Sequence, residues 1–320
     1  MVSNKLPAHL DKQECRKIIN RLKDGLPPPA EAIEYLSIGA KPYLERARQG
    51  LAMADNGRFD STILVGPYGI GKSHLLRRVQ VMAEAEGFAT RYLEIGGGIY
   101  FNNPEGIAQR IAGETYRDEL PLGRGYYTDR KFINQLNYVS RREQKNGRKA
   151  KGLVILLDEL ENSFDWSNLP LLKSRIKAYR YLDTLFYGHS ESPDNQYGLI
   201  NMYVMLAITP GVLERAMMEE PGYFYREGEW RANPAVQWRN GGLPDQIEIK
   251  PLQHLQAMDL LKRIREIHSR SFDWDAGQFV DSKELVQIAQ SWEYDGVNRD
   301  ERELVKAIIS RLEIAEQRRK

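Results

Sequence analysis

Residues 66–73 read GPYGIGKS, and this short run limits the fold of the chain more than any other segment. It matches the phosphate-binding loop pattern G-x-x-x-x-G-K-[ST] at every fixed position. The apolar residues 62–65 predict a strand before the loop, and residues 74–79 predict a helix after it. In that setting, backbone N–H groups and the start of the helix converge on phosphate oxygens. The sequence therefore predicts a nucleotide-binding α/β protein.

The side chains of this loop have separate predicted tasks. Lys72 can reach the β- and γ-phosphates of the nucleotide, and the hydroxyl of Ser73 can bind Mg²⁺. An accidental glycine-rich turn is the alternative, and the flanking strand and helix argue against it. The residues predicted to bind the nucleotide in this segment are Gly66, Pro67, Tyr68, Gly69, Ile70, Gly71, Lys72, Ser73 and His74.

The composition narrows the class of protein. A chain of 320 residues with 42% hydrophobic and 28% charged residues is typical of a globular protein, and its net charge of +2 gives no bulk attraction to nucleic acid. The one cysteine, Cys15, excludes an intrachain disulfide framework. No apolar run reaches membrane-spanning length, and the N-terminus lacks a signal-peptide core. We therefore expect a cytoplasmic protein without a membrane partner.

Predicted strands and helices alternate through most of the chain, which is typical of a parallel α/β sheet. Beyond the loop helix, strands are predicted at 88–95, 153–157, 201–208 and 247–249, and helices at 104–117 and 131–145. After Pro251 the pattern becomes helical only. We predict a helical N-terminal segment at 1–50, a nucleotide-binding core at 51–251 and a helical lid domain at 252–320.

The apolar strand at 153–157 ends in Asp158 and Glu159. A carboxylate at this position is predicted to hold Mg²⁺ together with Ser73, which assigns Asp158 to the metal. Glu159 is the predicted catalytic base, which orients the attacking water. Two acids that merely cap the next segment are the alternative. Glu161 is a second candidate base, although it lies farther from the strand.

Thr209 follows the next apolar strand, in the sequence AITPG at 207–211. A polar side chain there can reach the γ-phosphate or the water, which makes Thr209 a catalytic candidate. An ordinary turn threonine before proline is the other interpretation, and the sequence alone does not separate the two.

Two further groups of residues are candidates for contacts with partners. Arg226, Arg231 and Arg239 lie in an aromatic-rich segment, and any one of them is a candidate arginine finger for transferred phosphoryl charge. A partner surface, a base-stacking surface or a self-packed loop would have the same composition. The basic residues that could contact the phosphates of duplex DNA are Arg141, Arg142, Lys145, Arg148, Lys149, Lys151, Lys173, Arg175, Lys177 and Arg180. A solvated basic face is the alternative.

Three passages carry a resemblance to a known family: residues 18–39 with their INRLKDGLPP and LSIG sequences, residues 66–76, and residues 156–161. The chain resembles AAA+ ATPases of the origin-recognition and signal-transducing type. More narrowly, it resembles the ATP-binding proteins (BrxD type) of bacterial BREX phage-exclusion systems. The resemblance implies a P-loop AAA+ core with a C-terminal helical lid, ATP as the nucleotide, and protein partners in a defence complex. It also makes a homo-oligomer plausible.

The resemblance also implies roles for single residues. The segment around Gly39 would contact the adenine, although Ala40 stands where such proteins often have arginine. Arg302 best matches the lid arginine that senses the γ-phosphate, and Arg299 comes second. Residues 184–200 resemble a family-variable loop with no assigned chemistry.

Three functions fit these residues. The leading hypothesis is an Mg²⁺-dependent ATPase that acts on DNA or on partner proteins in phage defence. The second is a nucleotide-dependent switch that holds ATP or ADP without turnover and recruits a partner. The third is a small-molecule kinase, against which Asp158, Glu159 and the helical lid argue.

Overall fold

The computed structural model describes residues 6–121, 128–145, 149–164, 172–189, 198–218, 224–226, 229–231, 238, 243–294 and 300–319. The chain divides into two compact units. Unit 1 comprises residues 1–43, 67–81 and 249–320, and unit 2 comprises residues 44–66 and 82–248. The boundaries at 50 and 251 that the sequence suggests remain predictions.

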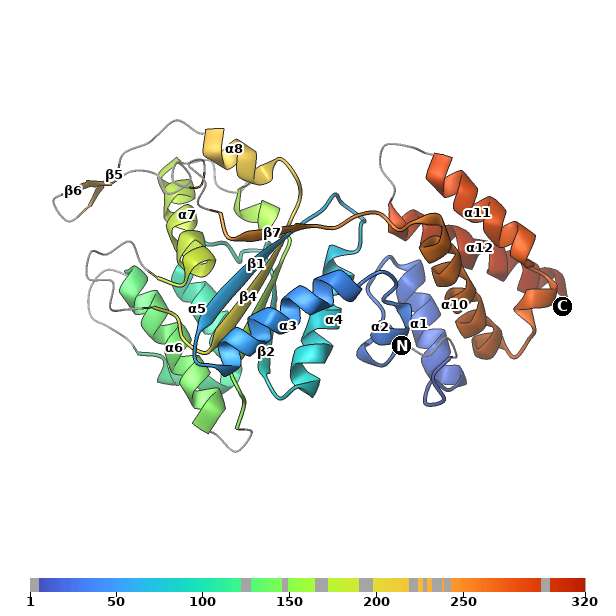
Figure 1. Ribbon diagram of the computed structural model, residues 1–320, viewed down its shortest axis with the longest axis horizontal. Helices are drawn as coiled ribbons and strands as arrows, with labels where there is room; N and C mark the ends of the chain where they lie inside the picture. Colours follow the sequence, from blue (N-terminus) through green and yellow to red (C-terminus); the bar gives the residue numbers. More distant parts are fainter. Residues whose placement is uncertain are drawn as a thin grey trace. The chain divides into compact units, whose positions relative to one another are not determined.

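Unit 2 contains a parallel five-stranded sheet (Figure 1). Its strands, in spatial order, are β2 (Ala89–Glu94), β3 (Leu153–Asp158), β4 (Met202–Ile208), β1 (Phe59–Val65) and β7 (Asp245–Glu248). The two strands richest in apolar residues, β3 and β4, are buried along their whole length. Strands covered on both faces require such sequences, and this confirms the predicted α/β fold class.

Side chains alternate between the two faces of this sheet. On one face, residues such as Ile155 and Val204 join a core with α5 (Pro104–Tyr116), α6 (Asp129–Lys145) and α7 (Leu172–Tyr187). On the other face, Tyr203 meets α3 (Lys41–Asp55) at Gly50, where an added Cβ would lie 2.2 Å from the tyrosine ring. Only glycine allows so close an approach of helix and sheet. Two further elements of unit 2 are α8 (Val212–Met218) and the hairpin of β5 (Phe224–Arg226) and β6 (Glu229–Arg231).

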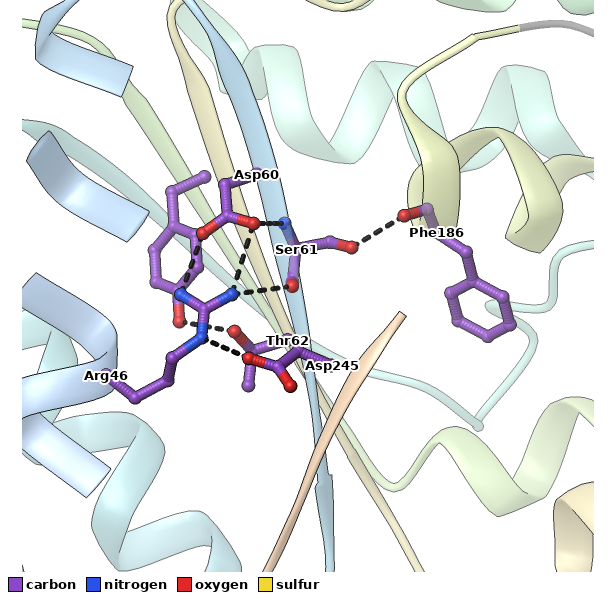
Figure 2. A network of polar contacts seen from close by, with 7 residues as sticks. Arg46, Asp60, Ser61, Thr62, Phe186 and Asp245 are labelled. Atoms are coloured by element: carbon purple, nitrogen blue, oxygen red, sulfur yellow. Dashed lines mark hydrogen bonds and ion pairs between the residues drawn. The ribbon is translucent and has the colours of Figure 1, made fainter. Parts of the chain in front are cut away.

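Arg46 ties α3 to the sheet (Figure 2). Its guanidinium donates to both carboxylate oxygens of Asp60, at 2.7 and 3.1 Å, and to Asp245 at 2.7 Å. It also donates to the carbonyl oxygen of Ser61 at 3.2 Å. Asp60 lies on β1 and Asp245 begins β7, so one side chain spans two neighbouring strands. The planar, multiply donating guanidinium suits this task in a way that a lysine ammonium does not.

Unit 1 is helical and draws on both ends of the chain. Its helices are α1 (Lys12–Lys23), α2 (Ala30–Leu36), α10 (His254–Phe272), α11 (Ser282–Tyr294) and α12 (Glu301–Arg319), together with the first turns of α4 (Lys72–Ala85). In Figure 1, α1 lies beside α10, and the two ends of the chain form one apolar core. The predicted helical lid is therefore confirmed as a helical C-terminal region. Among the described helices, none is both long and apolar enough to cross a membrane.

The Arg46 network predicts a measurable stabilisation of unit 2. Arg46→Ala would leave the carboxylates of Asp60 and Asp245 facing each other without their shared donor. We expect it to lower the free energy of unfolding by about 1–3 kcal/mol, measured by chemical denaturation. Arg48→Ala is the matched control, because Arg48 lies on the same helix and is 53% exposed in a loose 3.7 Å pair with Glu86. Equal losses in both variants would contradict the assignment.

Candidate functional site

The predicted catalytic residues follow strands that end at one edge of the sheet. Val65 at the end of β1 pairs in register with Ile208 at the end of β4, and the N–H of Gly66 donates to the Ile208 carbonyl at 3.1 Å. Thr209 follows β4 directly, and Asp158 is the last residue of β3. The structure therefore starts the phosphate loop from the edge at which Asp158 and Thr209 lie.

Asp158 is buried, and two donors fix its carboxylate. The backbone N–H of Glu159 donates to Oδ1 at 3.0 Å, and the hydroxyl of Tyr92 donates to Oδ2. Tyr92 lies on β2, two residues before Glu94, which pairs with Asp158 in register. Sequence reasoning missed Tyr92. The one indication in the sequence was that Tyr92 and Glu94 share a face of the predicted strand at 88–95, because side chains alternate along a strand.

Glu159 has an unusual backbone for a residue with a side chain. Its φ of +53° lies in the left-handed region, which costs free energy and occurs most often at functional sites. Burial raises the pKa of the Glu159 carboxyl, and the neighbouring Asp158 raises that pKa further. The amide of Asn162 opposes the shift by donating to the carboxylate at 3.3 Å. These features suit an acid–base group better than a simple cap.

The phosphate loop itself belongs to unit 1 from Pro67 onward. Gly69 and Gly71 have φ values of +80° and +91°, which a residue with a Cβ rarely adopts. Lys72 is a buried residue, and its ammonium group donates to the Pro67 carbonyl at 3.1 Å. The lysine is thus held across the start of its own loop.

His74, the first residue after the loop pattern, is an uncharged histidine that contacts Ser37 within unit 1. Its Nε2 lies 2.8 Å from the Ser37 hydroxyl oxygen, and that hydroxyl donates its proton to the Ile33 carbonyl at 2.6 Å. Because the Ser37 hydroxyl already donates its proton to Ile33, Nε2 of His74 must be the donor in its contact with Ser37. Burial lowers the pKa of His74 to about 4. The contact connects the loop helix to the segment that precedes Gly39.

Gly39 is also left-handed, with a φ of +70°. A Cβ added at this position would lie 2.9 Å from Nε2 of Gln256, whose other amide atom accepts from the N–H of Gln253 at 2.8 Å. The helical start of α10 therefore packs on Gly39. A contact between this segment and the adenine stays a prediction.

Three consecutive residues at the start of α12 meet the phosphate loop inside unit 1. A Cβ on Gly69 would lie 2.0 Å from the Asp300 carboxylate, and one on Gly71 would lie 3.2 Å from Glu301. The Arg302 guanidinium lies over the ring of Tyr68, with 4.3 Å between Cζ and the ring centroid. Sequence reasoning singled out Arg302 but missed Asp300 and Glu301. Acids that begin a helix usually act as caps, so nothing in the pattern marked them as loop contacts.

Glu301 is the most strongly perturbed acid of this contact. Burial raises its pKa to about 8, against the opposing effect of a backbone hydrogen bond from Leu252. At neutral pH the carboxyl therefore keeps its proton and adds no negative charge beside the loop.

Some basic residues of these clusters are buried, and others are exposed. Arg175 and Arg180 are buried, so the prediction that they contact DNA is wrong. Arg142 pairs with Glu119, Arg180 with Asp129, and Lys151 with Asp55 at 3.3 Å. The clustered residues that stay exposed, besides Lys151, are Arg141, Lys145, Lys149 and Lys177. Arg148 and the side chain of Lys173 lie outside the described structure.

The arginine-finger candidates are only partly described. Arg226 ends β5 and Arg231 ends β6, and the structure describes their backbones but not their side chains. Arg239 lies outside the described residues, as does most of the predicted loop at 184–200. The neighbouring Trp238 is buried and donates to Asp183 at 2.8 Å. It therefore serves the core of unit 2 rather than a partner surface.

The predicted Mg²⁺ site depends on a small number of protein oxygen atoms. Among the residues that the structure describes, no group of three or more His, Cys, Asp or Glu side chains could hold a metal ion alone. Mg²⁺ at nucleotide sites takes few protein ligands, because the phosphates and water supply the others. Binding of Mg²⁺ by the Asp158 carboxylate and the Ser73 hydroxyl stays a prediction.

The parallel sheet, the phosphate loop after β1, the acids after β3 and the helical C-terminal region are the features of an ATP-binding α/β protein with a phosphate loop. The chain belongs to the family of BREX system ATP-binding proteins BrxC/D, whose family model matches residues 10–112 and 123–320. The family predicted from the sequence is thus confirmed. No curated protein matches the chain.

Several solved structures are similar to this chain at low identity. Drosophila ORC bound to DNA has 15% identity and a TM-score of 0.46, covering 88% of this chain and 62% of that chain. Aeropyrum pernix ORC1 in complex with DNA has 16% identity and a TM-score of 0.44, with the same coverages of 88% and 62%. S. cerevisiae Hsp104 in a casein complex has 15% identity and a TM-score of 0.43, covering 94% and 40%. This chain thus spans 40–62% of their lengths.

The raised pKa of the half-buried Glu301 predicts a pH dependence for the stability of unit 1. The folded unit keeps the proton up to about pH 8, whereas an unfolded chain releases it near pH 4.5. The contribution of this group to stability therefore falls as the pH rises between these values and changes little above them. Across this interval the free energy of unfolding of Glu301→Gln should rise relative to that of wild type by roughly 1 kcal/mol per pH unit at most. Denaturant unfolding at several pH values measures this difference.

Glu303→Gln is the matched control, because Glu303 lies on the same helix with a side chain that is 65% exposed. It should follow the wild-type pH dependence. A difference between Glu301→Gln and wild type that does not vary with pH would contradict the shifted pKa.

Proposed function

We propose that this protein hydrolyses ATP to ADP and phosphate in an Mg²⁺-dependent reaction. The observation that carries the proposal is Glu159, which follows the buried Asp158 in a left-handed backbone and has a raised pKa. A general base works best when its pKa approaches the working pH, so the direction of the shift favours catalysis. The phosphate loop, which begins at the same sheet edge, supports ATP as the substrate.

Each residue has a proposed role. Lys72 neutralises charge on the β- and γ-phosphates, Ser73 and Asp158 hold Mg²⁺, and Glu159 accepts a proton from the attacking water. Thr209 contacts the γ-phosphate or the water. Gly39 provides backbone contact with the adenine, and Arg302 donates to the γ-phosphate from the lid. The remaining loop residues, Gly66, Pro67, Tyr68, Gly69, Ile70, Gly71 and His74, shape the phosphate cradle.

The wider biological role is part of the same proposal. Membership in the BrxC/D family supports a role in phage defence, with ATP turnover acting on DNA or on partner proteins. The exposed residues Arg141, Lys145, Lys149 and Lys177 are the proposed contacts with DNA phosphates. Arg226, Arg231 and Arg239 remain candidates for an arginine finger, supplied to a neighbouring copy if the protein forms a homo-oligomer. We place the protein in the cytoplasm, where ATP is present and Cys15 stays reduced.

Steady-state phosphate release tests the proposal directly, with and without duplex DNA. Glu159→Gln should bind ATP normally and lose at least about 100-fold in turnover, because it lacks the base. Lys72→Ala should lose ATP affinity. Glu161→Gln is the matched control and should retain turnover. Wild-type protein that binds ATP without turnover under any condition would favour the alternative function, a nucleotide-dependent switch that recruits a partner.

Tyr92→Phe tests the proposed metal site. The variant keeps the ring but removes the hydroxyl that donates to Asp158, so the carboxylate loses part of its fixed orientation. We expect the Mg²⁺ concentration for half-maximal turnover to rise about 10-fold, as is typical when a hydrogen bond to a metal ligand is lost. The affinity of ATP-loaded protein for Mn²⁺ should fall in parallel.

Tyr203→Phe provides the control for this experiment. Tyr203 is a buried tyrosine on β4 whose hydroxyl donates to Thr62 at 3.1 Å, so its loss removes a comparable bond on the same face of the sheet. It should leave the Mg²⁺ dependence unchanged. An equal shift in both variants would mean that Tyr92 acts only through the stability of the sheet.

A further inference from the structure

The phosphate loop carries an aromatic side chain that its own packing does not explain. Tyr68 is 64% exposed, whereas the apolar loop residue Ile70 is 2% exposed. The negative face of an aromatic ring attracts a cation such as a guanidinium. The one group that the described structure places over the Tyr68 ring is the Arg302 guanidinium, at 4.3 Å from the ring centroid.

Arg302 is placed there by the start of its helix. The Asp300 carboxylate accepts from the backbone N–H of Arg302 at 2.8 Å and also packs on Gly69. Acidic residues flank Arg302 in the sequence, yet within the described ranges its side chain forms no ion pair, and Glu303 pairs with Lys306. Stacking uses the flat face of a guanidinium and leaves its N–H edges able to donate.

We propose that Tyr68 is a positioning residue that holds the Arg302 guanidinium flat at the phosphate loop, so that its N–H groups meet the γ-phosphate of ATP. The pair then lets the protein distinguish ATP from ADP, which lacks the group that Arg302 contacts. This inference rests on the proposed role of Arg302 as the γ-phosphate sensor. An ammonium group would not serve equally well, because lysine lacks a planar face and five fixed donors.

A double-mutant cycle on nucleotide affinity tests the inference without relying on turnover. The Kd values for ATP and ADP are measured with Mg²⁺ for wild type, Tyr68→Leu, Arg302→Gln and the double variant, and each ADP-to-ATP ratio is compared. Arg302→Gln should lower this ratio toward one. Tyr68→Leu should lower it by about 2- to 30-fold, the range expected for one cation–π contact. The double variant should match Arg302→Gln alone.

Tyr68→Phe supplies the conservative rescue. It keeps the aromatic face and should keep the wild-type ADP-to-ATP ratio. Thermal unfolding of each variant identifies any general loss of structure, which would weaken both nucleotides alike.

The variants test the role of Arg302 and the role of Tyr68 separately. If Arg302→Gln leaves the ratio unchanged, the proposed role of Arg302 is wrong. If Arg302→Gln lowers the ratio while Tyr68→Leu does not, or if the two effects multiply in the double variant, Arg302 keeps its role and the inference about Tyr68 is overturned. Equal weakening of ATP and ADP by Tyr68→Leu would also overturn it, because the ring would then serve the shape of the loop or direct nucleotide contact.

Discussion

The left-handed backbone at Gly69 and Gly71 is the constraint on which the nucleotide-binding region depends. These φ values shape the phosphate loop, and they also leave the space that α12 uses. Any side chain at Gly69 would collide with the Asp300 carboxylate, which lies 2.0 Å from the Cβ position. The glycine at position 69 therefore determines both the geometry of the loop and the packing of α12 against it within unit 1. A substitution at Gly69 would disturb the phosphate cradle and the placement of Arg302 together.

A second set of constraints operates at the edge of the sheet in unit 2. The inner strands must be apolar because helices cover both faces, so polar residues appear where strands end. Asp158 is such a residue, and the Tyr92 hydroxyl and the Glu159 N–H hold its carboxylate in one orientation. Arg46 likewise fixes the carboxylates of Asp60 on β1 and Asp245 on β7, where the effect is structural. Fixed carboxylates are a requirement for metal binding, because a metal site tolerates little freedom in its ligands.

Local sequence patterns predicted the strands and the turn that depend on neighbouring residues. Apolar runs predicted β3 and β4 to within one residue at each end, and the loop pattern predicted the turn between β1 and α4. Contacts between distant residues could not be predicted in this way. Tyr92 and Asp158 are 66 residues apart, and Gly69 meets an acid from the far end of the chain. The sequence did not predict the burial of Arg175 and Arg180, because charged residues on a helix are expected to face solvent. The partner that pairs with Arg180, Asp129, is distant in the sequence.

The central claim is that this chain binds ATP at the phosphate loop and transfers its γ-phosphoryl group to water. The most direct measurement follows radiolabelled γ-phosphate on purified wild-type protein with Mg²⁺, in a single turnover with enzyme in excess over ATP. The account predicts that bound ATP is converted to ADP and that all of the label appears as inorganic phosphate. Label that remains in bound ATP, or that moves to an acceptor other than water, would contradict it.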